Sequence, residues 1–436
     1  ARIEGIFISL KIIVEEDRKT LILDIGSAYL NARIDSEVFM WLGREVAEII
    51  IKIMPEYKDY LDDRGRLLVQ IEKALYGLIQ SAKLWYDHLT GVLLKNGFKV
   101  NKMDECIWNM TKNGIQTTIV IYVDDLLISS KSQEEIYKVR DLIKKEFNEI
   151  KTKEGDEVTY LGMLLLKKAD GSIEINMKSY IECTLKEWKE DDYFEYTIPA
   201  DTKLHYNGPE SQPSKKKDLF HRVVAKLLYL SKRARPDIAL AVSYLCTRVQ
   251  TPTVQDENKL TRILGYLYST IDKTRNITKD SNESMKITAY IDAAFGAHED
   301  GKGQSGCAIF VGTTLVDVIT RKQKCASRDS TEAELIALSD LTIDVEWHCE
   351  WFINQGYEME KPTIYQDNTS TITLVTTATP GKMRNKHLRA QRAAIYEGYD
   401  KGDYFIIYIK TDEMVADILT KPLEGTKFHK FAKIML

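Results

Sequence analysis

Residues 117–130 have the sequence TTIVIYVDDLLISS, which places two adjacent aspartates inside an otherwise apolar run. The flanking Val, Ile and Leu residues are typical of buried strands, and they predict a strand, a tight turn at Val123–Asp125 and a second strand. Taking a carboxylate out of water costs several kcal/mol unless a partner compensates, and an adjacent like charge raises that cost. Because turns favour Asp for local reasons, Asp124 and Asp125 by themselves indicate a structural turn more often than a site.

A second acid follows an apolar strand earlier in the chain, in LILDIGSAYLNA (21–32). This strand delivers Asp24, which is followed by Gly26, small residues and Tyr29. A pair of divalent metal ions offsets the free-energy cost of burying the carboxylates that converge on it. Such a metal pair is suited to in-line displacement at phosphorus. The two segments together therefore predict a metal-dependent phosphoryl-transfer site.

The segment LDIGSA allows a different interpretation, because retroviral-type aspartic proteases carry Leu-Asp-Thr/Ser-Gly-Ala. In those enzymes the residue after the aspartate supplies a hydroxyl group that braces the catalytic pair of carboxylates. This chain has Ile25 at that position, and no second flap-like region follows. The protease interpretation is therefore disfavoured.

Isolated acids also stand at the ends of predicted elements in the C-terminal third of the chain. Asp292 ends the strand KITAYID, and Asp367 ends the strand TIYQD. Asp417 lies on the predicted helix EMVADILTK, after the strand DYFIIYIK. Each of these acids alone would be a cap or a surface residue more often than a ligand.

The segment DSTEAELIALSDLTIDVEWHCEWF predicts an amphipathic helix with two glutamates to choose from. At helical spacing, one apolar stripe starts from Glu334 and runs to Phe352, so Glu334 is predicted to lie on the buried face. Glu332 lies off that stripe, three residues after Asp329, and is predicted to cap the helix start. The periodicity therefore selects Glu334 as the fourth acid. Four carboxylates in this order of elements indicate two-metal phosphodiester hydrolysis: Asp292, Glu334, Asp367 and Asp417.

The chain contains no internal repeat, and two polar stretches, 205–218 and 272–284, divide it. Three blocks are expected. Residues 1–176 mix strands and helices, residues 177–283 are mainly helical, and residues 284–436 return to an alternation of strands and helices.

The net charge of −4 argues mildly against a nucleic-acid partner when the whole chain is considered. Between Lys203 and Arg275, however, 14 Lys and Arg stand against 6 Asp and Glu. A solvated helical surface and a track for phosphate groups both explain this excess. The cluster includes Lys215, Lys216, Lys217, Lys232, Arg233 and Arg235.

Two further features exclude other classes of protein. The sequence has no run of about 18 apolar residues, so no membrane span is expected. The six cysteines show neither a CxxC motif nor paired Cys/His spacing, so they suggest neither a zinc site nor a disulfide framework, and a reducing, intracellular setting is expected.

Four motifs occur in a fixed order: DIGSAY (24–29), KALYGLIQSAKLWY (73–86), IYVDDLLI (121–128) and YLGM (160–163). Together they resemble the motif series of a reverse transcriptase, and most closely that of the copia-type (Pseudoviridae) LTR retrotransposon Pol polyprotein. The resemblance implies that Asp24, Asp124 and Asp125 are the polymerase metal ligands and that Tyr29 is a steric gate against the ribose 2′-OH. It further implies template and nucleotide contacts for Tyr76, Gly77 and Gln80, and a primer grip at Leu161, Gly162 and Met163. Ordinary core packing is the alternative for Tyr29 and Tyr76.

The motifs YIDAAFG, STEAELIAL, YQDN and VADILTKPL resemble the RNase H domain of the same family. That resemblance implies catalytic and metal-binding roles for Asp292, Glu334, Asp367 and Asp417. His387 in RNKHLR matches a family histidine and is assigned no catalytic role.

The fold that the two resemblances imply is an α+β and α/β multidomain chain. A right-hand polymerase palm with partial fingers occupies 1–176, a basic helical thumb or connection 177–283, and an RNase H-like domain with a mixed five-stranded sheet 284–436. The implied activities are RNA-directed DNA polymerisation and RNase H cleavage, with two Mg²⁺ per active site and Mn²⁺ as a substitute. The implied partners are an RNA template, a DNA primer, the RNA–DNA hybrid and dNTPs. The expected location is intracellular, in a cytoplasmic virus-like particle with access to the nucleus.

The sequence departs from the family in two places. Ala82 follows Gln-Ser where many copia elements have Pro, and the basic fingers that precede the first motif in the family are expected to be missing. Two alternatives stay open for this reason. One is a decayed or domesticated copy that binds nucleic acid without polymerising, and the other is a chain that retains only RNase H activity.

Overall fold

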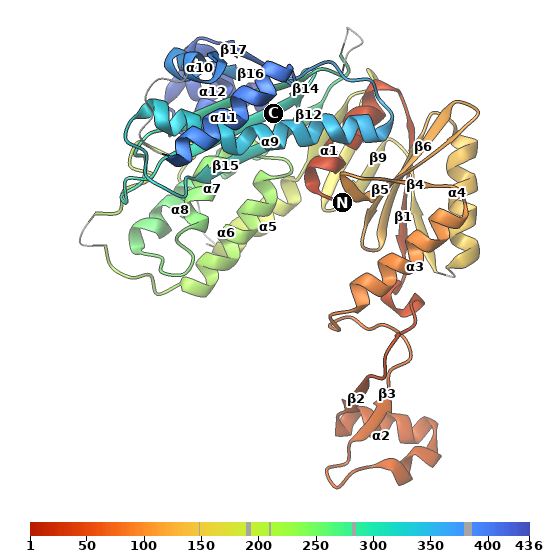
Figure 1. The fold of residues 1–436 in the computed structure, drawn as a ribbon. Coiled ribbons are helices and arrows are strands. Elements are labelled where there is room, and N and C mark those ends of the chain that lie inside the picture. The colour runs from red at the N-terminus through yellow and green to blue at the C-terminus, as the bar shows by residue number, and fades with distance from the viewer. Residues whose placement is uncertain (148, 189–192, 209–210, 281–284, 379–385) are drawn as a thin grey trace. The chain divides into compact units, whose positions relative to one another are not determined.

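The computed structural model describes residues 1–147, 149–188, 193–208, 211–280, 285–378 and 386–436 (Figure 1). The chain mixes helices with several separate sheets. It forms two compact units, and the smaller one consists of Thr20–Val100 and Cys106–Lys153. The larger unit consists of Ala1–Lys19, Asn101–Glu105 and Glu154–Leu436. No described helix combines the length and the apolar character that crossing a membrane requires.

The smaller unit is built on a six-stranded sheet in the order β4-β5-β6-β7-β1-β8. The pairs β5–β6, β6–β7 and β1–β8 are antiparallel. A separate two-stranded ribbon pairs β2 with β3. The elements are β1 (Lys19–Ile25), η1 (Ala28–Asn31), β2 (Phe39–Leu42), α2 (Arg44–Ile53), η2 (Pro55–Tyr60), β3 (Leu67–Gln70), α3 (Ser81–Lys95), β4 (Lys99–Asn101), β5 (Asp104–Lys112), β6 (Ile115–Tyr122), β7 (Asp125–Ser130), α4 (Gln133–Glu146) and β8 (Ile150–Lys153).

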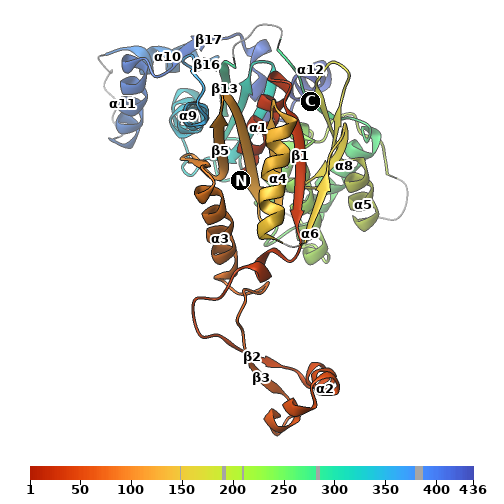
Figure 2. The ribbon, with the colours of Figure 1, turned by 90° about the vertical axis from the view of Figure 1, so that its right-hand side faces the viewer.

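Helices α3 and α4 cover one face of this sheet, and Figure 2 shows α4 beside β1. Alternate residues of β1, such as Leu21 and Leu23, point into the core, as the pleat of a strand requires. The apolar arms around the acidic turn supply Ile121 and Leu126 to the same core. The strand–turn–strand predicted for 117–130 is therefore confirmed as β6 and β7.

The larger unit contains a four-stranded sheet and a five-stranded sheet. The four-stranded sheet has the order β12-β11-β10-β9, and all of its pairs are antiparallel. The strands are β9 (Glu157–Tyr160), β10 (Met163–Lys167), β11 (Ile173–Asn176), β12 (Arg275–Ile277), β13 (Ile287–Ala294), β14 (Gln304–Val311), β15 (Thr314–Lys322), β16 (Thr363–Gln366) and β17 (Phe405–Tyr408). The helices are α1 (Ile3–Glu15), α5 (Lys178–Trp188), α6 (Lys217–Ser231), η3 (Pro236–Ile238), α7 (Ala239–Cys246), α8 (Val254–Ser269), α9 (Ser330–Gln355), α10 (Thr369–Thr376), α11 (Lys386–Lys401), η4 (Thr411–Glu413), η5 (Val415–Leu419) and α12 (Gly425–Met435).

The five-stranded sheet has the order β15-β14-β13-β16-β17. Strands β13, β14 and β15 are antiparallel neighbours, whereas β16 runs parallel to β13 and β17 runs parallel to β16. The mixed five-stranded sheet expected in residues 284–436 is therefore present.

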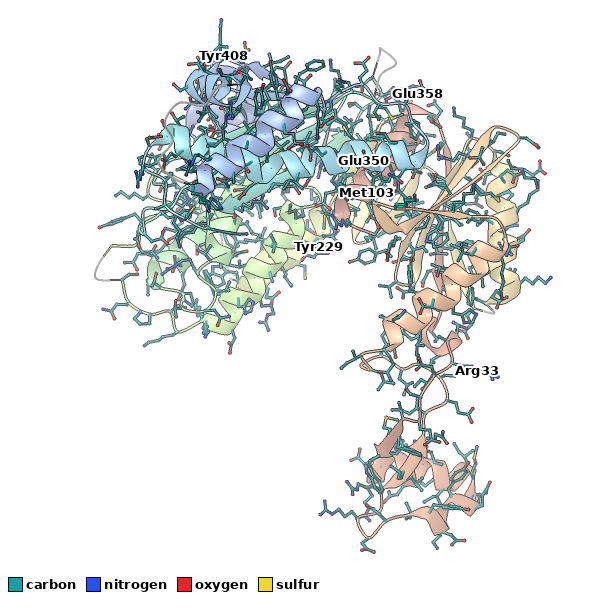
Figure 3. All side chains as sticks on the ribbon, viewed as in Figure 1. Arg33, Met103, Tyr229, Glu350, Glu358 and Tyr408 are labelled. Carbon is teal, nitrogen blue, oxygen red and sulfur yellow. The ribbon has the colours of Figure 1, made fainter. Side chains whose placement is uncertain are left out.

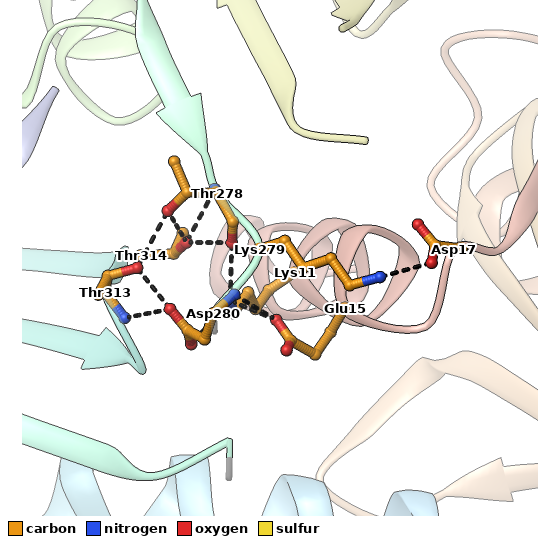
Figure 4. A network of polar contacts seen from close by, with 8 residues as sticks. All are labelled: Lys11, Glu15, Asp17, Thr278, Lys279, Asp280, Thr313 and Thr314. Carbon is orange, nitrogen blue, oxygen red and sulfur yellow. Dashed lines mark hydrogen bonds and ion pairs between the residues drawn. The ribbon is translucent and has the colours of Figure 1, made fainter. Parts of the chain in front are cut away.

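Helix α1 belongs to the larger unit although it precedes the first strand of the smaller one. It is apolar almost all round and packs against β12 and β15. Its one central charge, Lys11, is buried, and its ammonium group donates to Glu15 Oε2 at 2.8 Å, the Thr278 carbonyl at 2.8 Å and Asp280 Oδ2 at 3.0 Å (Figure 4). Because a buried charge is tolerated only when it is paired, this network stabilises the position of α1 in its unit.

The division into 1–176, 177–283 and 284–436 stays a prediction. The middle block is mainly helical in its described residues, with α5, α6, α7 and α8, but it also contains β12. Strand β12 pairs with β11 of the first block. The boundaries of the two compact units therefore differ from the boundaries of the three sequence blocks.

Candidate active sites

The turn between β6 and β7 consists of two residues, Val123 and Asp124, because Tyr122 already pairs with Asp125. Val123 has φ 58°, a conformation that is strained for a β-branched residue. Two hydrogen bonds hold the turn in place. The Trp85 indole Nε1 donates to the Val123 carbonyl at 2.7 Å, and the Ile25 amide donates to the Asp124 carbonyl at 3.0 Å.

Asp24 lies near the end of β1, which is the neighbour of β7 in the sheet. The three aspartates of this turn and strand influence one another electrostatically. Burial raises the pKa of Asp125, and the negative charges of Asp124 and Asp24 raise it further, while Lys153 opposes the shift. The structure therefore brings Asp24, Asp124 and Asp125 into one region of the smaller unit, as the sequence predicts.

Two tyrosines border these acids. The rings of Tyr29 and Tyr76 lie 4.3 Å apart, centroid to centroid. Tyr76 is 63% exposed, so packing into the core does not account for it. Partial burial, the negative charges of Asp124 and Asp24 and the Tyr29 phenol all raise the pKa of Tyr76.

Gly77 and Gln80 lie in the loop that leads into α3. Gly77 has φ 102°, which favours glycine, and Gln80 directly precedes the first residue of the helix. The Ser81 hydroxyl donates to the Leu75 carbonyl at 2.7 Å and closes this loop. Tyr76 and Gly77 are exposed, whereas Gln80 is half-buried.

Leu161 and Gly162 form the two-residue turn between β9 and β10, in the larger unit. Both have positive φ, 47° and 73°. The Tyr229 hydroxyl, from α6, donates to the Leu161 carbonyl at 2.6 Å (Tyr229 is labelled in Figure 3). Met163 is fully buried, whereas Leu161 is half-buried and Gly162 is exposed.

In the second centre, Asp292, Glu334 and Asp367 each place a carboxylate oxygen within 4.8 Å of the other two. Among the described residues, this is the one group of at least three acidic, His or Cys side chains that lies so close together. Asp292 comes from β13, Glu334 from the second turn of α9, and Asp367 directly follows β16. Asp292 and Glu334 are buried, and Asp367 is half-buried.

Burial and mutual repulsion disfavour the charged forms of these acids. Burial raises the pKa of Asp292 to about 6, and Asp417 and Asp367 contribute, although Lys421 and the Thr420 hydroxyl oppose the shift. Burial also raises the pKa of Glu334 well above its usual range, with help from Asp292 and Asp367.

The choice between the two glutamates of α9 is resolved by their surroundings. Glu334 is 4% exposed and receives a hydrogen bond from the Gln366 side-chain amide at 3.2 Å. Glu332 is half-buried, and its backbone amide donates to Asp329 Oδ1 at 2.8 Å, which is the cap of the helix. The helix register predicted from periodicity is confirmed.

Asp417 lies beside this cluster of three carboxylates but outside it. Its Oδ1 is 2.9 Å from Lys421 Nζ and its Oδ2 is 2.6 Å from Lys427 Nζ. Lys421 Nζ is also 3.3 Å from Asp292, so it bridges the two aspartates. The residue sits in a 3₁₀ turn, Val415–Leu419, and the predicted helical segment around it is therefore wrong in type.

The cluster of three carboxylates suits a divalent cation. Carboxylate oxygens are the donors that Mg²⁺ prefers, and a cation between them would remove the repulsion and the desolvation that raise their pKa values. Asp292, Glu334 and Asp367 would hold such an ion, whereas Asp417 is paired with two lysines. Asp24, Asp124 and Asp125 offer the same type of donor atom, and all three residues are half-buried.

Sequence reasoning missed Lys421, Thr420 and Trp85. Lys421 follows Asp417 by four residues, a spacing that pairs opposite charges on one helical face and could have signalled the contact. The Thr420 hydroxyl donates to Asp292 Oδ2, and no sequence pattern indicates this bond. Trp85 belongs to KALYGLIQSAKLWY, but the motif does not show that its indole reaches Val123.

The basic segment divides into structural and accessible charges. Arg235 is fully buried, where its Nε and Nη2 donate to the two carboxylate oxygens of Asp237 at 3.0 and 2.8 Å. Arg233 is also buried and lies 3.5 Å over the Tyr229 ring. The exposed charges of the predicted cluster are Lys215, Lys216 and Lys217, and Lys232 is half-buried. Arg235 is therefore unavailable to a phosphate group. Fewer positive charges can line the predicted phosphate track than the charge count of the sequence suggests.

Residues 1–202 match the family model described as "Reverse transcriptase (RNA-dependent DNA polymerase)". The chain is also similar to the "Retrovirus-related Pol polyprotein from transposon RE1" of Arabidopsis thaliana, with 27% identity over 94% of this chain and 27% of that protein. A similar relative is the Pol polyprotein from transposon TNT 1-94 of Nicotiana tabacum, with 23% identity over 93% of this chain and 30% of that protein. These findings confirm the resemblance to the reverse transcriptase region of copia-type Pol polyproteins. The chain spans less than a third of the length of these two polyproteins.

One further relative is matched over its whole length. The "Putative transposon Ty5-1 protein YCL074W" of Saccharomyces cerevisiae is 24% identical over 74% of this chain and 100% of that protein. Among solved structures, the LC11-RNase H1 isolated from compost matches 31% of this chain and 93% of its own, with 15% identity and a TM-score of 0.25.

Proposed function

We propose that the chain is an RNA-directed DNA polymerase that also cleaves the RNA strand of RNA–DNA hybrids. The observation that carries the proposal is the close group of Asp292, Glu334 and Asp367 on a chain whose first 202 residues match a reverse transcriptase family model. The proposed substrates are a primed RNA template, dNTPs and the hybrid product. Mg²⁺ is the proposed metal, two ions to a site.

At the polymerase centre, Asp24, Asp124 and Asp125 would hold the ions. When bound, divalent cations neutralise the phosphate charge and lower the pKa of a primer 3′-hydroxyl. The chain's own contribution is positional, because the strained turn fixes Asp124 through Trp85 and Ile25. The Tyr29 and Tyr76 rings would border the incoming nucleotide, and the bulk of Tyr29 would disfavour a ribose 2′-OH.

At the nuclease centre, Asp292, Glu334 and Asp367 would hold the ions and orient the water that attacks the scissile phosphate. Lys421 would keep Asp417 in place and supply a positive charge beside Asp292. Asp417 is proposed as a fourth ligand, and it would have to exchange its lysine partners for that role. Neither centre needs a side-chain nucleophile.

The architecture suits this assignment. We interpret the six-stranded sheet with α3 and α4 as the palm, and the helical region α5 to α8 as the thumb or connection. The turn at Leu161–Gly162 would be the primer grip, fixed by Tyr229. A cytoplasmic virus-like particle with access to the nucleus is the proposed location.

A chain that has only the nuclease activity is the second candidate. The observation that favours it is the tight grouping of Asp292, Glu334 and Asp367, which the three aspartates of the other centre do not match among the described residues.

The test is a paired assay on one preparation. Primer extension on an RNA template and cleavage of a labelled hybrid are both measured with Mg²⁺ and then with excess chelator. The proposal expects both activities with Mg²⁺ and neither with chelator. Cleavage without extension would select the second candidate, and the absence of both from folded protein would contradict the proposal.

A further inference from the structure

Thr420 directly follows η5 and is fully buried. Its hydroxyl donates to Asp292 Oδ2, although Asp292 lies 128 positions earlier in the chain, on β13. The hydroxyl has one proton, and its contact with the Asp417 carbonyl oxygen is longer, at 3.3 Å. The Asp292 carboxylate is therefore the main acceptor of this proton.

A second group also donates to the Asp292 carboxylate. Among the described residues it is the Lys421 ammonium group, at 3.3 Å. The Lys421 side chain is 40% exposed, and Asp417 shares its ammonium group. Threonine, in contrast, reaches its hydroxyl through one side-chain dihedral, which β-branching restricts. The buried Thr420 hydroxyl therefore fixes the plane of the Asp292 carboxylate more firmly than the long lysine side chain does.

The backbone around Thr420 is fixed to the same sheet that carries Asp292. The Thr420 amide donates to the Asp417 carbonyl at 3.2 Å. The Thr320 hydroxyl, on β15, donates to the Leu419 carbonyl at 2.6 Å and accepts from the Gln304 side-chain amide, on β14, at 2.7 Å. Both partners of the bond between Thr420 and the carboxylate are thus held by one sheet.

Gly306, on β14, is the antiparallel partner of Asp292. A Cβ atom at this position would lie 2.7 Å from Thr420 Cγ2 and 2.8 Å from Leu419 Cβ, closer than real Cβ atoms come to their neighbours. The φ of Gly306 lies outside the left-handed region, so the requirement for glycine is one of space. A glycine inside a strand often marks the close approach of another segment. Gly306 therefore provides the space that brings Thr420 to Asp292.

We propose that Thr420 is a positioning residue of the nuclease centre, whose hydroxyl orients the Asp292 carboxylate toward a divalent cation. The inference rests on the proposed hybrid cleavage. Thr420 would touch neither the hybrid nor the ion. Removing a group that hydrogen-bonds a metal-binding side chain typically costs about 10- to 100-fold in metal affinity or activity.

The test measures Mn²⁺ binding by titration calorimetry, without nucleic acid, on the full chain with Asp124→Asn, which weakens the polymerase centre. Binding is assigned to the nuclease centre by its loss on adding Glu334→Gln. Thr420→Val removes the hydroxyl and keeps the shape of the side chain, so we expect about 10- to 100-fold weaker binding. Thr420→Ser keeps the hydroxyl and should bind as the parent does.

The matched control is Thr342→Val. Thr342 is 5% exposed, and its hydroxyl donates to the Leu338 carbonyl at 2.7 Å within α9, so this variant loses a buried hydroxyl that touches no carboxylate. Its Mn²⁺ affinity should equal that of the parent. In hybrid cleavage, Thr420→Val should lower kcat and leave KM nearly unchanged, because the hydroxyl does not contact the substrate.

An unchanged Mn²⁺ affinity in folded Thr420→Val would overturn the proposal, as would equal losses in Thr420→Val and Thr420→Ser or a parent whose Mn²⁺ binding does not depend on Glu334. If Thr420→Val does not fold, Thr420→Ala is compared with Thr420→Ser, because the two differ by the hydroxyl oxygen alone. Equal affinities in that pair would also overturn the proposal.

Gly306→Ala tests the same contact from the opposite side. The added Cβ should displace Thr420 and weaken Mn²⁺ binding, and Gly306→Ala/Thr420→Ser should bind more tightly than Gly306→Ala because serine lacks Cγ2. An unchanged affinity in Gly306→Ala would contradict the inference. A wild-type chain that binds Mn²⁺ through Glu334 but does not cleave hybrids would contradict the proposed nuclease alone.

Discussion

Replacing Trp85 with phenylalanine removes the indole N–H that holds the Val123 carbonyl at 2.7 Å. Trp85 is 2% exposed and packs edge-on against Phe147, with 5.1 Å between ring centroids. The lost hydrogen bond costs about 1–3 kcal/mol, and the smaller ring leaves a packing gap, so we expect a total of about 2–4 kcal/mol of unfolding free energy. The strained turn would then relax and displace Asp124.

A displacement of about 1 Å in a catalytic group costs about 10²-fold in rate, so primer extension by Trp85→Phe should fall by one to two orders of magnitude. Urea denaturation gives the stability change and steady-state extension gives the rate. The matched control is Trp347→Phe, whose indole donates to the Met103 carbonyl at 3.2 Å within the larger unit. Hybrid cleavage should change little in either variant. If Trp85→Phe is destabilised but extends primers at the wild-type rate, Trp85 is only a core residue and the reasoning is refuted.

Four further substitutions test three separate parts of the account. Glu332→Gln should keep hybrid cleavage and cost at most about 1 kcal/mol of unfolding free energy, typical of a weakened cap, whereas Glu334→Gln should abolish cleavage; the opposite pattern would contradict the register of α9. Asp237→Asn should destabilise the larger unit by about 3–5 kcal/mol in urea denaturation, because it leaves the buried Arg235 without its counter-charge, and a cost below about 1 kcal/mol would argue against that network. Tyr29→Val should raise incorporation of rNTPs while dNTP rates change less, and an unchanged rNTP/dNTP ratio in extension assays would leave Tyr29 as a packing residue.

Local patterns in the sequence were sufficient for much of the candidate sites. Alternating apolar residues predict β6 and β7, and turn chemistry places the acids between them. Helical periodicity distinguishes Glu334 from Glu332 because one stripe of α9 faces the core. These features depend on residues close together in the chain, which a sequence shows directly.

Long-range pairing was not predictable in the same way. Asp292 was expected to end its strand, but β13 continues to Ala294 because that residue pairs with Gln304 of β14. The charge count between Lys203 and Arg275 could not show that Arg235 is buried against Asp237. Likewise, the packing of α1 on β15, more than 290 positions away in the sequence, leaves no local pattern to detect.

The central claim is that one chain carries two separate metal-dependent centres, and a crossed pair of variants tests it most directly. Asp124→Asn and Glu334→Gln are each assayed for primer extension and hybrid cleavage with Mg²⁺, after circular dichroism has shown that both are folded. The account predicts that Asp124→Asn loses extension and keeps cleavage, and that Glu334→Gln keeps extension and loses cleavage. Loss of both activities in either folded variant would contradict it.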